Sequence, residues 1–152
     1  LSLSYELLDS LDISKTTFSK GEKMIFSFQI TNNTDSLLYY EPDFINEEFF
    51  KVYKVSNGAK SAIGKPYKGL YCDYIAIDYM SIQPSQTVRY SIPWTPDSNN
   101  CCPPFCNIIK NSPLDKGEFI TSFSSKFKLF TKNREIEYIS DIMTFTINFN
   151  IE

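Results

Sequence analysis

Apolar and polar residues alternate most regularly between residues 23 and 31, and the rest of the chain repeats this pattern. The apolar positions recur at every second residue: Met24, Phe26, Phe28 and Ile30. The positions between them are mostly polar: Lys23, Ser27, Gln29 and Thr31. A period of two places successive side chains on opposite faces of a β-strand. The stretch therefore predicts a strand with one buried face and one solvated face, bounded on both sides by turn-forming residues.

The same alternation predicts further strands, and no segment has the periodicity of an amphipathic helix of ordinary length. Asn57-Gly58 adds a hairpin signal, because both residues accept positive φ. We therefore predict an all-β fold, an immunoglobulin-like two-sheet antiparallel β-sandwich of seven to eight strands, in one domain over residues 1–152. The Gly- and Pro-punctuated stretches 59–73 and 93–115 are expected to be loops. The clearest strands span residues 1–7, 23–31, 37–40, 49–55, 88–94, 118–130 and 143–151, and the last should bury Met143, Phe145, Ile147, Phe149 and Ile151.

Histidine is absent from all 152 residues, and this absence narrows the chemistry more than any other count. Without imidazole the chain cannot build a Ser-His-Asp triad, a Cys-His pair or a His-ligated zinc site. We therefore expect a protein that is not an enzyme, with no catalytic residue, no metal and no cofactor. The net charge of −3 gives no basic footprint for nucleic acid. No apolar run approaches the roughly 20 residues that span a bilayer.

Four cysteines, Cys72, Cys101, Cys102 and Cys106, are the least ordinary feature of the sequence. Three of them lie in a Pro-rich stretch, so we predict two disulfides that staple a loop at about residues 94–116 to the sandwich. Three connectivities are open, and a vicinal 101–102 bridge would be strained. A four-thiolate metal site and free thiols are the alternatives, although adjacent cysteines fit the usual ligand spacing badly. Disulfides predict an exported protein, periplasmic, at the outer-membrane surface or secreted.

The start of the chain bears on the same question of cellular location. It begins at Leu1 without a Met, so we expect that a signal peptide has been removed or left out, and a lipid anchor ahead of Leu1 would be invisible. Membrane contact is expected only through such an N-terminal lipid anchor outside this chain. Asn32-Asn33-Thr34 is an N-glycosylation sequon, relevant only in a eukaryotic secretory setting.

Acidic residues gather in one short stretch, which includes Glu41, Asp43, Glu47 and Glu48. A calcium site or a carboxylate pair for glycosidic chemistry would use such residues. The Asp-x-Asp-x-Asp-Gly spacing of a calcium loop is absent, and acidic runs are usually solvated loops. We therefore interpret the stretch as a solvated loop.

Tyrosine and phenylalanine are more numerous than one sandwich core needs, with 10 and 13 in the chain. Some are therefore expected on loops or edges, where aromatic rings contact protein or carbohydrate. The alternative is a small core filled with Phe and Tyr in place of aliphatic residues. A stapled loop is preorganised for binding, so we place the candidate surface on it and on residues 67–74. Its members are Tyr67, Tyr71, Tyr74, Pro103, Pro104 and Phe105.

Four segments occur in the order of a known module: FSKGEKMIFSFQITNNTD, FFKVYKVSNG, IQPSQTVRYSIPW and LDKGEF. This layout resembles the BsuPI-type domain, an immunoglobulin-like module named for an intracellular proteinase inhibitor and common in exported bacterial proteins. The β-sandwich domain that precedes the catalytic domain of deuterolysin-like metallopeptidases has a similar outline. Ser85 stands where the outline usually has Gly, and the cysteine loop is extra. Neither pattern supplies site residues.

The Asn-, Lys-, Ile- and Phe-rich composition is typical of an AT-rich genome such as a flavobacterium's, where such modules are often surface lipoproteins. Together with the resemblance it implies an exported lipoprotein of the Bacteroidetes. We therefore expect a non-enzymatic exported binding or assembly module that contacts a protein partner through loops or a sheet edge. The alternatives are a BsuPI-type proteinase inhibitor that presents residues 103–105, a carbohydrate-binding module, and a carboxylate-based enzyme.

Overall fold

The computed structural model describes residues 1–70, 79–96, 104–132 and 137–152, and β-strands make up nearly all the regular structure in them. One short 3₁₀ turn, η1 (Pro42–Phe44), is the exception, and it starts where Pro42 was expected to end a strand. None of the described residues forms a helix long and apolar enough to cross a membrane. The strands are β1 (Ser2–Leu8), β2 (Thr17–Phe18), β3 (Ile25–Thr31), β4 (Leu38–Tyr40), β5 (Val52–Ser56), β6 (Ala59–Gly64), β7 (Tyr67–Leu70), β8 (Met80–Ile82), β9 (Thr87–Pro93), β10 (Phe105–Ile108), β11 (Gly117–Ser125), β12 (Lys128–Phe130), β13 (Glu137–Ile139) and β14 (Met143–Ile151).

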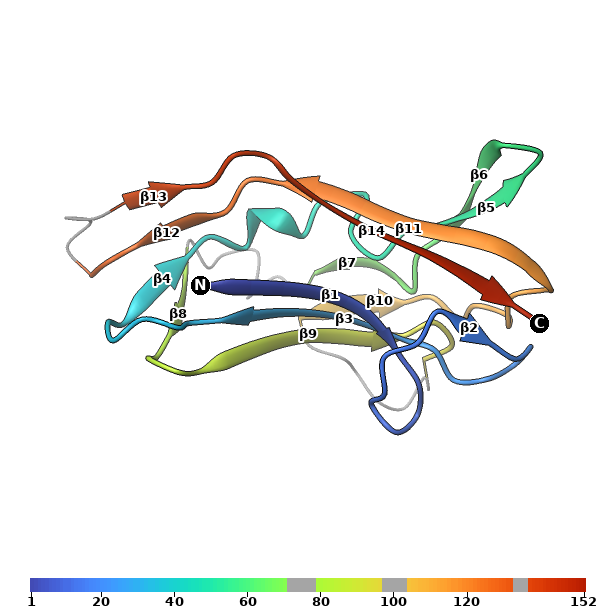
Figure 1. The fold of residues 1–152 in the computed structure, drawn as a ribbon, viewed down its shortest axis with the longest axis horizontal. Helices are drawn as coiled ribbons and strands as arrows, with labels where there is room; N and C mark the ends of the chain where they lie inside the picture. Colours follow the sequence, from blue (N-terminus) through green and yellow to red (C-terminus); the bar gives the residue numbers. More distant parts are fainter. Residues whose placement is uncertain (71–78, 97–103, 133–136) are drawn as a thin grey trace.

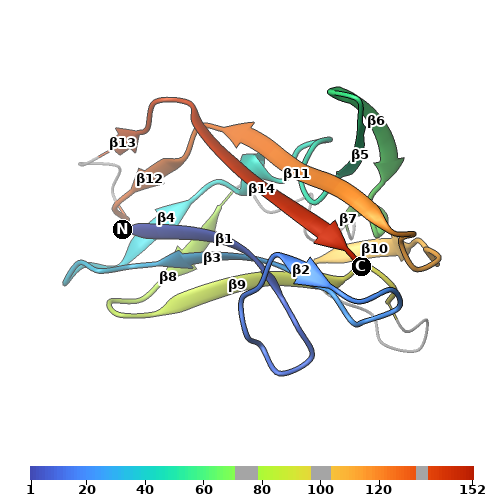
Figure 2. The same cartoon turned by 45° about the vertical axis from the view of Figure 1, so that its right-hand side comes forward.

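The fold is an all-β sandwich, as predicted, but the described residues form fourteen strands in four sheets rather than seven to eight strands in two. A three-stranded sheet, β1-β3-β9, lies below a five-stranded sheet, β2-β14-β11-β5-β6 (Figures 1 and 2). A four-stranded sheet, β13-β12-β4-β8, and the β10–β7 pair complete the described strands. Pairing is antiparallel except between β14 and β2. Tyr5 of the lower layer shares a hydrogen bond of 2.6 Å with Thr121 of the upper layer, so the two layers are tied by a polar contact within an apolar core.

Strand β3 lies at the centre of the lower sheet, in continuous antiparallel register with both β1 and β9. The apolar face predicted from its alternation is buried: Met24, Phe26, Phe28 and Ile30 are at most 3% exposed. The opposite face is less solvated than predicted, because Ser27 is also fully buried. Arg89 of β9 covers it, donating from Nε to Ser27 Oγ at 3.0 Å while its guanidinium pairs with Asp12 at 2.9 Å.

The Asn57-Gly58 hairpin between β5 and β6 is confirmed, with φ of 51° and 77° at the two turn residues. The strands that follow it were predicted as loop. Residues 59–64 form β6, and 67–70 pair with 105–108 inside the predicted loop after Trp94. Neither segment alternates clearly, so its strand conformation follows from pairing with a neighbour rather than from amphipathicity.

Two positions outside these strands also differ from expectation. Met143 is 38% exposed rather than buried, because burial increases along β14 only toward its C-terminal end. Asn32, the acceptor of the sequon, is fully buried, so the folded chain does not present its amide for modification. Ser85, which replaces the usual Gly of the BsuPI-type outline, has a φ of 61°, and this is the left-handed conformation that glycine adopts without steric cost.

Two buried phenols make the stability of this sandwich sensitive to alkaline pH. Burial raises the pKa of Tyr5 and of Tyr67 well above the usual value near 10. The unfolded chain releases these protons from about pH 10 upward, whereas the folded chain retains them. The contribution of these two phenols to the free energy of unfolding should therefore be constant up to about pH 10 and then fall by about 1.4 kcal/mol per pH unit for each phenol.

Urea titrations between about pH 9 and pH 11 measure this slope, and Tyr67→Phe should remove about 1.4 kcal/mol per pH unit of it. The comparison uses slopes rather than absolute stabilities, because the variant also loses the hydrogen bond from Tyr67 to the Phe49 carbonyl. Parallel curves for the two proteins would show that Tyr67 ionises in the folded state as readily as in the unfolded chain.

Candidate functional site: a basic hairpin edge beside a tryptophan-walled cleft

The predicted binding surface is wrong at every member whose side chain the structure describes. Tyr67 is 2% exposed, Phe105 is fully buried and Pro104 is also buried. The Tyr67 ring packs 4.5 Å from the Phe105 ring, and its hydroxyl donates to the Phe49 carbonyl at 3.2 Å. Pairing of β7 with β10 turns these rings toward the core, so they fill the sandwich instead of meeting a partner. Tyr71, Tyr74 and Pro103 lie outside the described residues.

The predicted disulfides also fall outside the described part of the chain. Cys72, Cys101 and Cys102 are not described, and of Cys106 only the backbone is, where it pairs with Gly69. The stapling of a loop at 94–116 therefore stays a prediction. Within that range, residues 105–108 are strand and not loop.

The four clustered carboxylates pair with lysines. Glu41 accepts from Lys128 at 2.6 Å, and Glu47 lies 3.4 Å from Lys65. Glu48 pairs with Lys51 at 2.7 Å and accepts from the Tyr53 hydroxyl, and these hydrogen bonds, with Lys51 the larger cause, lower the pKa of Glu48. Asp43 lies 4.0 Å from Lys128. Within the described ranges no three His, Cys, Asp or Glu side chains are placed to hold a metal ion. Ion pairing accounts for this cluster without a ligand.

Strand β6 offers an exposed sheet edge. It forms the outer edge of the five-stranded sheet and is exposed at five of its six residues (Ala59–Gly64). The β5–β6 hairpin extends beyond the sandwich at one end of the molecule (Figure 1). In the described part of the chain, only β5 pairs with β6, so among these residues the backbone donors and acceptors on the other edge of β6 have no strand partner. Proteins usually blunt such an edge with charge, and here a single lysine, Lys60, stands on it.

The hairpin and its flanks are basic although the chain is acidic. Residues 49–70 contain no Asp or Glu, while the whole chain has a net charge of −3. Lys51 and Lys65 pair with Glu48 and Glu47. The remaining lysines of the stretch, Lys54, Lys60 and Lys68, have no described carboxylate within 4.0 Å. Of these three lysines, Lys60 stands on the free edge strand β6, Lys54 on the neighbouring strand β5 and Lys68 on β7.

A cleft of about 240 Å³ opens beside this edge. Trp94 at the end of β9 and Phe119 of β11 supply aromatic walls, and Ile63 of β6 stands at the rim, 45% exposed. Asn111 fixes the far wall, because its amide donates to the Trp94 carbonyl at 3.1 Å and to the Lys65 carbonyl at 3.4 Å. The cleft is lined by Lys54, Ile63, Trp94, Asn111, Ser112, Pro113, Leu114, Asp115 and Phe119.

Lys54 brings a positive charge into this cleft. Its ammonium nitrogen lies 6.0 Å from the centre of the Phe119 ring. The stem of Lys54 passes close to Gly117, where a β-carbon would stand 3.4 Å from Lys54 Cε, an ordinary van der Waals contact. Asp115 is the one acidic residue of the lining, and a hydrogen bond from Lys20 at 2.7 Å is the main cause that lowers its pKa. Lys54 contributes to the same lowering, so Lys20 and Lys54 together outweigh the single carboxylate and leave this side of the cleft positively charged.

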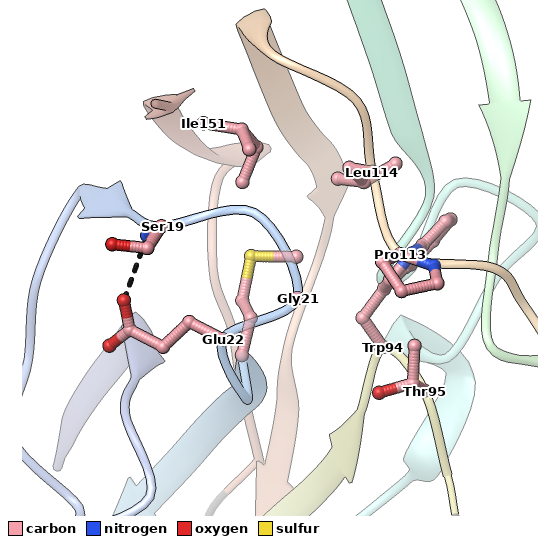
Figure 3. Close-up of a pocket in the computed structure, with 9 residues that line it drawn as sticks. Ser19, Gly21, Glu22, Trp94, Thr95, Pro113, Leu114 and Ile151 are labelled. Atoms are coloured by element: carbon pink, nitrogen blue, oxygen red, sulfur yellow. Dashed lines mark hydrogen bonds between the residues drawn. The ribbon is translucent and has the colours of Figure 1, made fainter.

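Two other hollows compare poorly with this cleft as binding sites. On the other side of Trp94, a cavity of about 20 Å³ lies among Met24, Pro113, Leu114 and Ile151 (Figure 3). That volume holds about one water molecule, so it cannot hold a ligand. A groove of about 360 Å³ lies far from the hairpin, between Leu1 and the β4–β12–β13 strands, and its described lining has no charged side chain. The groove also borders an edge strand, β13, so the cleft beside β6 is distinguished by the positive charge that accompanies its volume and its strand edge.

Comparisons with known proteins do not assign a family. No protein-family model matches the chain, and no curated protein does. One solved structure that is similar is the beta-glucosidase from Listeria innocua in complex with gluconolactone, at 11% identity and a TM-score of 0.31. The match covers 97% of this chain and 16% of that one, so the chain spans about a sixth of the length of the glucosidase. A likeness at this level carries no argument about fold or function.

Neither part of the candidate site, the free edge of β6 or the cleft beside it, was predicted from the sequence. One signal was present, because the lysines of residues 51–68 are separated by no acidic residue. The edge itself gave no signal, since the sequence Ala59-Lys60-Ser61-Ala62-Ile63-Gly64 does not alternate. The cleft joins residues that are more than 50 positions apart, such as Ile63 and Phe119, and only the fold brings them together.

Proposed function

We propose that this chain is a non-enzymatic binding module that takes up an extended segment of a partner protein along the free edge of β6. The observation that carries the proposal is the exposure of this edge strand: five of the six residues of β6 are exposed. In strand addition, backbone hydrogen bonds along the edge supply affinity, and pockets beside it supply specificity. The cleft lined by Ile63, Trp94 and Phe119 is such a pocket.

A binding role also agrees with the chemistry available. The chain has no histidine, and the carboxylates of the acidic cluster are engaged with lysines. The resemblance to BsuPI-type modules supports binding as well, and with the composition it supports the exported, envelope-associated setting that is part of the proposal. Burial of Pro104 and Phe105 argues against the inhibitor loop that this resemblance suggested.

Selection of random peptides on the immobilised chain, followed by amide hydrogen exchange, tests the proposal. Selected peptides should protect the amides of β6 from exchange while leaving those of the groove beside Leu38 and Leu129 unchanged. Failure to enrich any peptide, or protection confined to that groove or another surface, would contradict strand addition at β6.

Adjacent proline substitutions on β6 provide a matched pair of variants. In an antiparallel edge strand, alternate N–H groups point toward β5 and away from it, so one of Ser61→Pro and Ala62→Pro removes an outward donor and the other breaks the β5 ladder. The variant that removes the outward donor should keep the stability within about 1 kcal/mol of the parent and weaken peptide binding at least about tenfold. If the stable variant binds selected peptides as the parent does, the edge of β6 is not the docking site.

A further inference from the structure

We infer that the partner segment is acidic and carries one apolar anchor residue, which enters the cleft beside β6. This inference rests on the proposed strand addition and specifies the chemistry of the segment. Two independent features of the structure carry it: the distribution of unneutralised lysines around the edge, and the mixed aromatic and cationic lining of the cleft.

The first feature is charge complementarity on both faces of the hairpin. Lys60 is opposite Val55 in the β5–β6 ladder, whereas Lys54 is opposite Ser61. Side chains alternate between faces along a strand, so these two lysines stand on opposite faces of the sheet. A docked strand also alternates, so a carboxylate on its Lys60 face would meet an ammonium group on the edge strand itself, while Lys54, one strand further in, adds positive charge on the other face. A basic segment would meet like charges on both faces.

The second feature is the lining of the cleft. Lys54 and Ile63 line the cleft, so a residue of the docked strand that points to this face lies beside Ile63 at its rim. The aromatic walls, Trp94 and Phe119, provide apolar contact for that residue. The ammonium of Lys54 lies on the β11 side of the cleft, near Gly117 and the Phe119 ring, so it adds positive charge behind the position of the anchor. The fitting pattern is an apolar residue with a carboxylate at the adjacent position, on the Lys60 face of the docked strand.

The cleft contains its own reporter, because Trp94 is the single tryptophan of the chain. A selected acidic peptide with an apolar anchor should change the Trp94 emission on binding. The same peptide with the anchor replaced by serine should bind at least about fivefold more weakly, the effect of losing roughly 1 kcal/mol of apolar contact, and leave the emission unchanged.

Charge variants test the acidic component. Lys54→Gln and Lys60→Gln should each weaken binding of the acidic peptide about three- to tenfold, with a smaller loss of affinity than the parent shows when salt rises from about 0.05 M to about 0.5 M. Lys126→Gln is the matched control, because Lys126 is exposed and lies in the connection between β11 and β12, outside the β5–β6 hairpin. Its affinity should stay within about twofold of the parent.

The outcomes separate this inference from the function on which it rests. If selected peptides protect the β6 amides but show no acidic preference and no salt dependence, strand addition stands and the charge inference fails. If acidic peptides bind with the expected salt dependence but without a change in Trp94 emission, the anchor does not enter the cleft and the inference fails in that part. If the β6 amides gain no protection at all, both fail.

Discussion

Replacing Phe28 by alanine is expected to lower the free energy of unfolding by about 3–5 kcal/mol, the range seen when a buried aromatic ring is truncated. Phe28 is fully buried at the centre of β3, between β1 and β9. Its ring meets five others with centroids at 5.1–5.8 Å, from the opposite sheet, from η1 and from connecting segments: Phe44, Phe49, Phe123, Phe127 and Phe145.

The size of this effect follows from where the ring lies. Removing it leaves a cavity that the surrounding rings cannot fill without breaking their own edge-to-face contacts, such as those of Phe49 with Phe123 and of Phe127 with Phe145. Urea denaturation followed by circular dichroism measures the change, and Phe28→Leu should cost less because it retains part of the volume. Leu11→Ala is the control, since Leu11 is 76% exposed and its truncation should change stability by less than about 0.5 kcal/mol. A Phe28→Ala loss as small as that of Leu11→Ala would show that the aromatic core is not tightly packed around β3.

The strands that could be predicted from sequence are those with one buried and one exposed face. β3, β9 and the C-terminal half of β14 follow their alternation, because the sandwich supplies an apolar layer on one side and solvent on the other. β6 has no such asymmetry: its residues are small or polar, and the strand exists because β5 pairs with it after the Asn57-Gly58 turn. Its identification requires the partner strand as well as the segment itself.

For two aromatic residues, the sequence predicted exposure where the fold buries the side chain. Tyr67 and Phe105 were placed on a surface because Gly, Pro and Cys surround them in the sequence, and these residues usually mark loops. Pairing of β7 with β10 overrides that local signal and buries both rings. The candidate site was likewise hidden, because the lysines are visible in the sequence but the cleft beside them depends on Trp94, Asn111 and Phe119 meeting across the fold.

Replacing Asn32 by aspartate should destabilise the protein by at least about 3 kcal/mol, because it places an uncompensated charge in a buried site. Asn32 is fully buried at the end of β3. Its amide nitrogen donates to the Ser36 carbonyl at 2.8 Å and to the Ile82 carbonyl at 3.1 Å. Its side-chain oxygen accepts from the backbone N–H and the hydroxyl of Thr34, at 3.0 and 2.7 Å. One side chain thereby closes the turn after β3 and joins it to β8.

A carboxylate keeps the two hydrogen bonds from Thr34 and turns the two donations into repulsion between oxygen atoms. Asn32→Ala, which removes all four contacts without adding a charge, should cost about 2–3 kcal/mol. Asn33→Asp is the matched control, since Asn33 is exposed and the same change of charge one residue away should cost less than about 0.5 kcal/mol. The three variants are compared by urea denaturation at neutral pH. An Asn32→Asp protein as stable as Asn33→Asp would mean that water reaches this site and that the amide does not hold the turn to β8.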